Sequence, residues 1–352
     1  MPQRETEMGI PAEVDDAPLR DPRAARIALG AYLRRLREDR RITAEAVAKS
    51  IHASASKISR IEGGHVRCRQ DDLASLLDLY ALDDASELAE LQELAYCGNK
   101  IERKSSHERW APKGLNRLRP LEKAATVLKC YETRHVPDLL QTPDYTRSVI
   151  GASFRGARGE LICSAEQVDS RVALQLQRQK ILTKRDPPRM WVLIEESALR
   201  ARVAEEAIWR QQIEFLIAKT ARQSDGRLSV TAQPGLTLQI LRSEACAPAI
   251  IPHSVTYLRS NMFNLQDVIY WPTLQAFVLR HSPDEVRRFR ETLDRVATLA
   301  EPVDHTSDIL AAILDSRPLP PSVDIDRKYK HRPTSFTENR AMAQQRQSGR
   351  NR

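Results

Sequence analysis

The sequence has little glycine and phenylalanine and no long hydrophobic segment. Its 352 residues include only 12 glycines and six phenylalanines, which argues against a mainly β fold around an aromatic core. The apolar runs, such as residues 309–314, fall short of the roughly 18 residues that a membrane-spanning helix needs. The acidic first residues show no signal-peptide pattern. We therefore expect a cytoplasmic protein that does not enter a membrane.

Signatures of metal, nucleotide and catalytic chemistry are also lacking. The five cysteines are far apart, with no C-x-x-C pair and no histidine at metal-ligand spacing. There is no P-loop or G-x-G-x-x-G motif. Glu195 and Glu196 could mimic paired carboxylates, but no histidine or further acid lies at an informative spacing, and we expect one of them to pair with an arginine such as Arg178. We therefore expect reduced thiols, no cofactor, no metal site and no enzymatic activity.

What the sequence does contain is an uneven distribution of charge. The net charge is +8, and residues 23–69 carry about +8 whereas residues 71–100 carry about −7. A solvated helical surface usually mixes its signs, so this separation indicates a basic face that binds a polyanion. The hydrophobic fraction of 41% is sufficient for true cores, and the length favours two or three domains.

The N-terminal region predicts five short helices between residues 23 and 100. Apolar side chains at helical spacing form one face of the first helix. Thr43 and Ser54 can cap the second and third helices, and Asp71 or Asp72 lies near the start of the fourth. A leucine-rich stretch predicts the fifth.

Residues 42–64 read ITAEAVAKSI and then HASASKISRIEGG. Two helices that cross closely need a small residue at the crossing, and Ala48 provides one. Apolar residues can hold the helix pair on the first helix: Val47, Ile51, Ile58 and Ile61. The second helix of the pair would then present a short-chained, polar and basic face to the DNA major groove.

This segment resembles the XRE-type helix-turn-helix family, whose members are relatives of the phage repressors. The pattern S-x-S-x-I-S-R-I-E-x-G is among that family's most specific signatures, and residues 54–64 match it throughout. The resemblance implies that DNA bases are read by Ala55, Ser56 and Arg60. It implies contacts to the DNA backbone from Ser54, Lys57, Ser59, His65, Arg67 and Arg69. It also implies a structural ion pair between Arg37 and Glu62.

Two residues depart from the pattern of that family. The family often has glutamine at the start of the second helix, where it binds a phosphate, and this chain has Ala44. The turn residue is commonly a glycine in the left-handed conformation, and here it is His52. Histidine tolerates that conformation better than most residues, so we expect the turn to be retained.

The sequence after the mainly α, phage-repressor-like domain predicts a mixed α/β or α+β domain. Thr142 followed by Pro143 predicts a helix start. Further helices are expected at residues 118–131, 168–183, 283–300 and 304–314. Strands are expected at residues 190–194, 236–241, 255–263 and 268–271. Seven aromatic residues here could line a ligand pocket, and we expect core packing for most of them: Tyr131, Tyr145, Trp191, Tyr257, Phe263, Tyr270 and Trp271.

This second region also resembles a family. Residues 136–145 and 178–200 are similar to an uncharacterised domain that follows XRE-type domains in the WhiJ-like group of actinobacterial regulators. In that group a glycine usually stands where this chain has Asp138. The predicted organisation is a mobile leader (1–22), a helix-turn-helix domain (23–100), a linker (101–114), a regulatory or partner-binding domain (115–316) and a disordered basic tail (317–352).

Together these features predict a sequence-specific transcriptional regulator, cytoplasmic and associated with the nucleoid. We expect a repressor that binds double-stranded DNA as a homodimer, because symmetric operators need two recognition helices. Its C-terminal domain is expected to sense a small-molecule effector or a partner protein. The alternative is an antitoxin-like interaction protein that binds a small acidic partner, as WhiJ-like regulators are often encoded beside one, and that uses DNA binding for autoregulation.

Overall fold

The structure is a computed structural model, and it divides the chain into two compact units. Unit 1 comprises residues 1–103 and 262–265, and unit 2 comprises residues 104–261 and 266–352. The residues that the structure describes are 21–101, 106–155, 162–221, 232–244, 251–261, 265–273 and 275–316. The predicted basic tail lies outside the described residues, as does the predicted leader up to residue 20.

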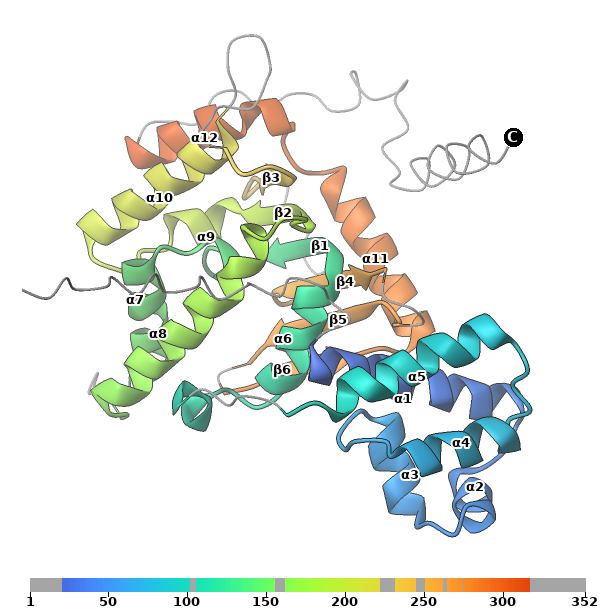
Figure 1. Ribbon diagram of the computed structural model, residues 1–352. Helices are drawn as coiled ribbons and strands as arrows, with labels where there is room; N and C mark the ends of the chain where they lie inside the picture. Colours follow the sequence, from blue (N-terminus) through green and yellow to red (C-terminus); the bar gives the residue numbers. More distant parts are fainter. Residues whose placement is uncertain are drawn as a thin grey trace, which may run out of the picture. The chain divides into compact units, whose positions relative to one another are not determined.

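Unit 1 is helical. Its elements are α1 (Pro22–Asp39), α2 (Ala44–Ser50), α3 (Ala55–Glu62), α4 (Gln70–Leu79) and α5 (Ala85–Asn99) (Figure 1). Four of the helices begin at a side chain that accepts backbone N–H groups of the first turn: Asp21, Thr43, Ser54 and Asp84. The five helices expected from the sequence are therefore confirmed, with Thr43 and Ser54 as caps.

Helix α1 is the centre of the unit 1 core. Its buried face includes Leu29, Leu33 and Leu36, and α1 packs against both α3 and α5. The Tyr32 hydroxyl donates a 2.6 Å hydrogen bond to Glu87 on α5. A helix with this apolar stripe is stable only when the stripe is covered, so α1 fixes the positions of its two neighbours.

Unit 2 contains a six-stranded mixed sheet in the order β3-β2-β1-β4-β5-β6. The first three strands pair in parallel, and the pairs β1–β4, β4–β5 and β5–β6 are antiparallel. The strands are β1 (Ala125–Glu132), β2 (Arg189–Glu195), β3 (Leu236–Leu241), β4 (Val255–Ser260), β5 (Val268–Pro272) and β6 (Phe277–Arg280).

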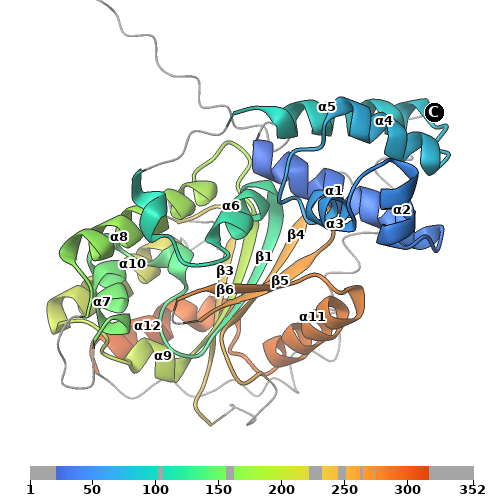
Figure 2. The ribbon, with the colours of Figure 1, turned by 90° about the horizontal axis from the view of Figure 1, so that it is seen from below.

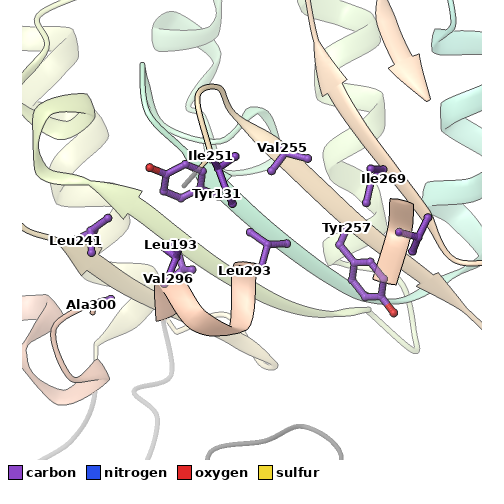
Figure 3. Packing of buried hydrophobic residues seen from close by; sticks show 11 residues of the cluster. Tyr131, Leu193, Leu241, Ile251, Val255, Tyr257, Ile269, Leu293, Val296 and Ala300 are labelled. Atoms are coloured by element: carbon purple, nitrogen blue, oxygen red, sulfur yellow. The ribbon is translucent and has the colours of Figure 1, made fainter. Parts of the chain in front are cut away.

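Helices cover both faces of this sheet. They are α6 (Leu115–Ala124), α7 (Pro143–Ser153), α8 (Ala165–Gln179), α9 (Glu196–Arg200), α10 (Glu206–Thr220), α11 (Pro283–Ala297) and α12 (Thr306–Leu314). Figure 2 shows α11 on one face and α7, α8 and α10 on the other. Beneath α11, Leu293 and Val296 pack on sheet residues such as Tyr131, Val255 and Leu193 (Figure 3).

The predicted helix over residues 118–131 is wrong in its second half. Helix α6 ends at Ala124, and the chain continues directly as β1, which lies between β2 and β4. Residues 125–131 read ATVLKCY, and their β-branched and aromatic side chains fit a strand that is buried on both faces. Strand β6 and helix α10 were not expected from the sequence.

Part of the predicted linker is folded into unit 2. Residues Ser106–Trp110 form the 3-10 helix η2, and the Trp110 carbonyl accepts a 3.2 Å hydrogen bond from Arg171 on α8. Glu108 forms an ion pair with Arg119 on α6 at 3.2 Å. These contacts attach residues 106–110 to α6 and α8.

Arg178 does not pair with either glutamate at the end of β2, contrary to expectation. It forms a buried, two-pronged ion pair with Glu122. Glu195 instead accepts a hydrogen bond from the Tyr131 hydroxyl, and Glu196 pairs with Arg200 at 2.6 Å. Both carboxylates thus have structural partners. In the described part of the chain, no helix is long and apolar enough to span a membrane.

Candidate DNA-binding surface

Helices α2 and α3 are joined by a tight turn. His52 adopts the left-handed conformation expected from the sequence, with φ of 53°, and the Ala53 amide donates a 2.8 Å hydrogen bond to the Ala48 carbonyl. Val47 and Ala48 on α2 are buried, as are Ile58 and Ile61 on α3. The small side chain of Ala48 and these apolar contacts set the angle at which α3 leaves the turn.

An ion pair holds the end of α3 to α1. Arg37 donates to both carboxylate oxygens of Glu62, at 2.6 and 2.9 Å, and to the Ile42 carbonyl at 3.0 Å. The paired carboxylate raises the pKa of Arg37. Both side chains are largely buried, so the two-pronged geometry restricts rotation of α3 as well as its position.

Helix α3 turns a polar face toward solvent. Ser54 is exposed and its hydroxyl accepts the Lys57 amide N–H at 3.1 Å, which satisfies one donor of the first turn. Ser56, Ser59 and Arg60 are exposed. Ala55 is partly buried in the first turn. These groups are short or cationic, a combination that suits contacts to base edges and phosphates.

A hollow of about 360 Å³ lies beside this face. It brings together six of the residues that the sequence analysis selected: Ser54, Ser56, Lys57, Arg60, Arg67 and Arg69. Val66 and Asp72 complete its lining. Ala55, Ser59 and His65 are not among the lining residues, although Ser59 and His65 are exposed. The arginines of the loop after α3 therefore share one concave surface with the polar face of α3.

The loop that carries the two arginines is held in place by α5. The Asn99 amide donates a 2.9 Å hydrogen bond to the Cys68 carbonyl, and Arg67 donates to the Lys100 carbonyl at 3.3 Å. Cys68 is buried, and burial raises the pKa of its thiol to about 12. Its neighbours Arg67 and Arg69 are exposed, so the loop has one buried anchor between two solvent-facing cations.

Asp72 was missed as a member of this surface by sequence reasoning. Its carboxylate binds the Lys57 ammonium at 2.6 Å, across 15 positions of the chain, and no local pattern signals such a pair. The pair occupies one of the three donors of the Lys57 ammonium group in the free protein. The acidic group also lowers the positive potential of the hollow, which otherwise favours an anion.

Gly30 on α1 is a second residue that sequence reasoning did not select. A Cβ atom at this position would lie 2.4 Å from the Ile61 carbonyl oxygen and 2.6 Å from that of Glu62. Only glycine therefore permits α1 to approach the backbone at the end of α3 this closely. A glycine in the middle of a helix is the available sequence signal.

Two family models match the chain. Residues 28–91 match a helix-turn-helix domain, and residues 115–312 match a domain of unknown function (DUF5753), which spans more than half of the 352 residues. No curated protein and no solved structure matches the chain. The first match points to DNA binding and to regulation of transcription. In this chain the helix-turn-helix domain precedes the domain of unknown function. The chain therefore belongs to the DUF5753 family.

Proposed function

We propose that this protein is a sequence-specific transcriptional regulator that acts as a dimeric repressor. The observation that carries the proposal is the shared hollow, in which Ser56 and Arg60 on α3 lie beside Arg67 and Arg69. In this proposal α3 enters the major groove, and its exposed face reads base edges. Ser54 and the loop arginines contact phosphates, which fix the register of the protein on the duplex.

Arg60 is the residue proposed to give most of the sequence specificity. It is exposed and lies in the last turn of α3, on the hollow. A guanidinium group can donate two hydrogen bonds to the major-groove edge of guanine. Ala55 and Ser56, the other proposed base-reading residues, have shorter side chains, so their contacts depend on how closely α3 approaches the bases. Lys57, Ser59 and His65 are proposed to contact the DNA backbone.

Dimerisation and sensing complete the proposal. A single α3 spans only a few base pairs, so a second copy of the chain reads the second half-site of a symmetric operator. We assign the sensing of a small molecule or partner protein to unit 2, and no catalytic step to either unit. A protein with this activity works in the cytoplasm, with the nucleoid.

Fluorescence anisotropy on labelled duplexes tests the DNA-reading step. Wild type and Arg60→Ala are compared on promoter DNA of the protein's own gene and on random DNA, at several salt concentrations. We expect Arg60→Ala to lose about 1–3 kcal/mol, or roughly 5- to 150-fold in affinity, on the promoter and little on random DNA. Arg147→Ala is the matched control, because Arg147 is an exposed arginine of unit 2 that pairs with Asp169.

Equal and weak binding of all three proteins to any sequence would contradict the proposal. The antitoxin-like alternative makes a different prediction. It requires a small acidic protein that co-purifies with the chain, and a regulatory response that depends on that protein alone. Affinity purification of the full chain from its native host, followed by mass spectrometry, distinguishes the two hypotheses.

A further inference from the structure

A cavity of about 430 Å³ lies in unit 2 at one edge of the sheet. Arg134 and His135 follow the end of β1, Pro272 ends β5, and His253 and Ser254 precede β4. Because β4 is antiparallel to both β1 and β5, these termini meet at the same edge. Helices α6, α7 and α8 and strand β6 also contribute to the wall.

This edge is also where the order of the strands reverses. The chain passes from β1 outward to β2 and β3, and then returns to the other side of β1 as β4. In open, mostly parallel α/β sheets, such a reversal leaves a crevice beyond the carboxyl ends of the parallel strands, where ligands bind. In this sheet the carboxyl end of β1 lies at the cavity, beside the start of the antiparallel β4. The cavity volume lies within the range of roughly 300–1,000 Å³ that is usual for small-molecule sites.

The polar lining of the cavity offers hydrogen-bond donors in excess. Arg171 on α8 donates its Nε to the Trp110 carbonyl and lies 4.6 Å above the Phe154 ring. Its guanidinium forms no ion pair with a carboxylate among the described residues, and neither does that of Arg134. The carboxylate of the cavity, Asp138, is already bound by Arg178 at 3.0 Å.

Two buried polar groups in the cavity wall have no hydrogen-bond partner in the described structure. One is the hydroxyl of Thr146, which is fully buried, and the other is the amide nitrogen of Gln175, which is 8% exposed. The Gln175 carbonyl accepts a 2.6 Å hydrogen bond from Arg178, so the NH₂ group must be the unpartnered end. Buried polar groups are normally satisfied, and a bound molecule would satisfy both.

The cavity wall also has a large apolar part, beside further polar residues such as Gln141, Ser153 and Thr273. The apolar part includes side chains from α6, α7, α8 and β6: Leu115, Val149, Ile150, Leu174 and Phe277. A ligand that fits must therefore combine hydrogen-bond acceptors and negative charge with an apolar body. A hydrocarbon body without the acceptors would leave the donors desolvated and unpaired, which is costly.

We propose that this cavity binds a small organic anion, with a carboxylate or phosphate head group and an apolar body. Arg171, Gln175 and Thr146 bind the head group, and Arg134 contributes positive charge at the rim. Binding of the anion is the sensing step of unit 2, and in this respect the inference rests on the proposed function. Ligand binding at this site is tested without DNA. A negative result for the ligand therefore leaves the proposal of DNA reading untouched, and a negative result for DNA leaves the ligand site untouched.

Ligand-observed NMR on the full chain tests the site with three probes of similar body. Benzoate and phenyl phosphate carry the two head groups, and benzyl alcohol is neutral. We expect at least one anion to bind ten times more tightly than benzyl alcohol. Arg171→Met, which retains an unbranched side chain but removes the guanidinium group, should weaken anion binding at least tenfold. The Arg147→Met control on α7 should bind as wild type does.

Thr146→Val gives a second readout that a merely structural role would not produce. Replacing an unpartnered hydroxyl with a methyl group should leave the free protein as stable or raise its Tm, while anion affinity falls several-fold. The ratio of benzoate to phenyl phosphate affinity identifies the preferred head group. The proposal is overturned if neither anion binds, if benzyl alcohol binds equally well, or if Arg171→Met and Thr146→Val both leave anion affinity unchanged.

Discussion

Asp72 places a carboxylate in the surface that is proposed to bind DNA. It binds Lys57 at 2.6 Å, and its other oxygen is buried without a hydrogen-bond partner in the described structure. The pair neutralises one cation of α3 in the free protein. DNA must therefore either leave this pair intact and accept a nearby negative charge, or separate the pair.

We expect Asp72→Asn to tighten DNA binding at low salt, by about three- to tenfold, because a negative charge is removed and Lys57 is released toward phosphate. The slope of log affinity against log salt should steepen by roughly one phosphate contact. Anisotropy titrations between low and moderate salt measure both quantities. Asp78→Asn, at an exposed position later on α4, is the control. A weaker complex at unchanged stability would mean that Asp72 positions Lys57 for its contact.

Glu132, at the end of β1, is a buried carboxyl with an unusual titration. Burial raises its pKa to about 8, and the nearby Asp138 adds to this effect, whereas a hydrogen bond with Ser254 partly opposes it. Its ordinary pKa is 4.5. The folded protein therefore favours the neutral form, and the stability that this provides is complete below about pH 4.5 and lost as pH rises toward 8.

Unit 2 should accordingly lose stability between about pH 5 and pH 8, on the order of 1 kcal/mol per pH unit from this group. Glu132→Gln keeps the shape and removes the charge, so its unfolding free energy should depend less on pH and exceed that of wild type at pH 8. All four tryptophans lie in unit 2, so urea denaturation followed by tryptophan fluorescence reports on this unit. Glu291→Gln, at an exposed site, should show the same dependence of unfolding free energy on pH as wild type. If Glu132→Gln also shows the wild-type dependence, the assignment to Glu132 is refuted.

At the scale of elements, the contact between α1 and α3 determines how the recognition helix is presented. Gly30 allows the two backbones to meet, and the Arg37–Glu62 pair holds them together. Both features act on the C-terminal end of α3, while its N-terminal end is positioned by the turn at His52. Helix α3 is only eight residues long, and isolated helices of this length are marginal, so its geometry depends on these contacts.

Gly30→Ala should destabilise unit 1 by about 1–3 kcal/mol, because the added methyl group overlaps carbonyl oxygens that cannot move without shifting α3. DNA affinity should also fall, and by more than the smaller fraction of folded protein accounts for. Gly151→Ala on α7 is the matched control: a Cβ there meets no atom within 4 Å, so the same change should stabilise its helix by about 0.5–1 kcal/mol. Circular dichroism follows the unfolding of Gly30→Ala, because unit 1 contains no tryptophan, and tryptophan fluorescence follows that of Gly151→Ala in unit 2. Unchanged stability and DNA binding in Gly30→Ala would show that α1 and α3 can separate at little cost.

At the scale of the whole molecule, the proposed dimer has a geometric consequence on DNA. Two copies of α3 related by two-fold symmetry bind half-sites about 10 base pairs apart, or a multiple of that spacing. Inserting about five base pairs rotates one half-site to the opposite face of the duplex, and we expect affinity to fall at least tenfold. Inserting about ten base pairs returns both half-sites to the same face of the duplex and should restore part of the affinity.

Gel-shift titrations on the three spacings measure this effect, with sedimentation of the free protein as the companion measurement. Equal affinity for all three duplexes would show that single copies bind independently. In that case the proposal of a dimeric repressor fails, while sequence-specific reading by α3 is judged by the Arg60 variant.

The sequence alone determined the first unit almost completely. Caps at Thr43 and Ser54, the left-handed turn at His52 and the apolar spacing of α2 and α3 are local features, because a helix start or a turn depends on a few consecutive residues. The polar face of α3 follows from the same spacing. Four strands of unit 2 were also predicted, because each is a short run of β-branched and apolar residues between polar segments.

Tertiary structure decided what depends on residues far apart in the chain. It made β1 a central strand where periodicity predicted a continuing helix, since burial between β2 and β4 outweighs local preference. It joined Lys57 to Asp72 and Arg178 to Glu122, pairs separated by 15 and 56 positions. It also brought the ends of β1 and β5 together around a cavity, because the position of a strand in the sheet is set by packing of the whole unit, and not by its own sequence.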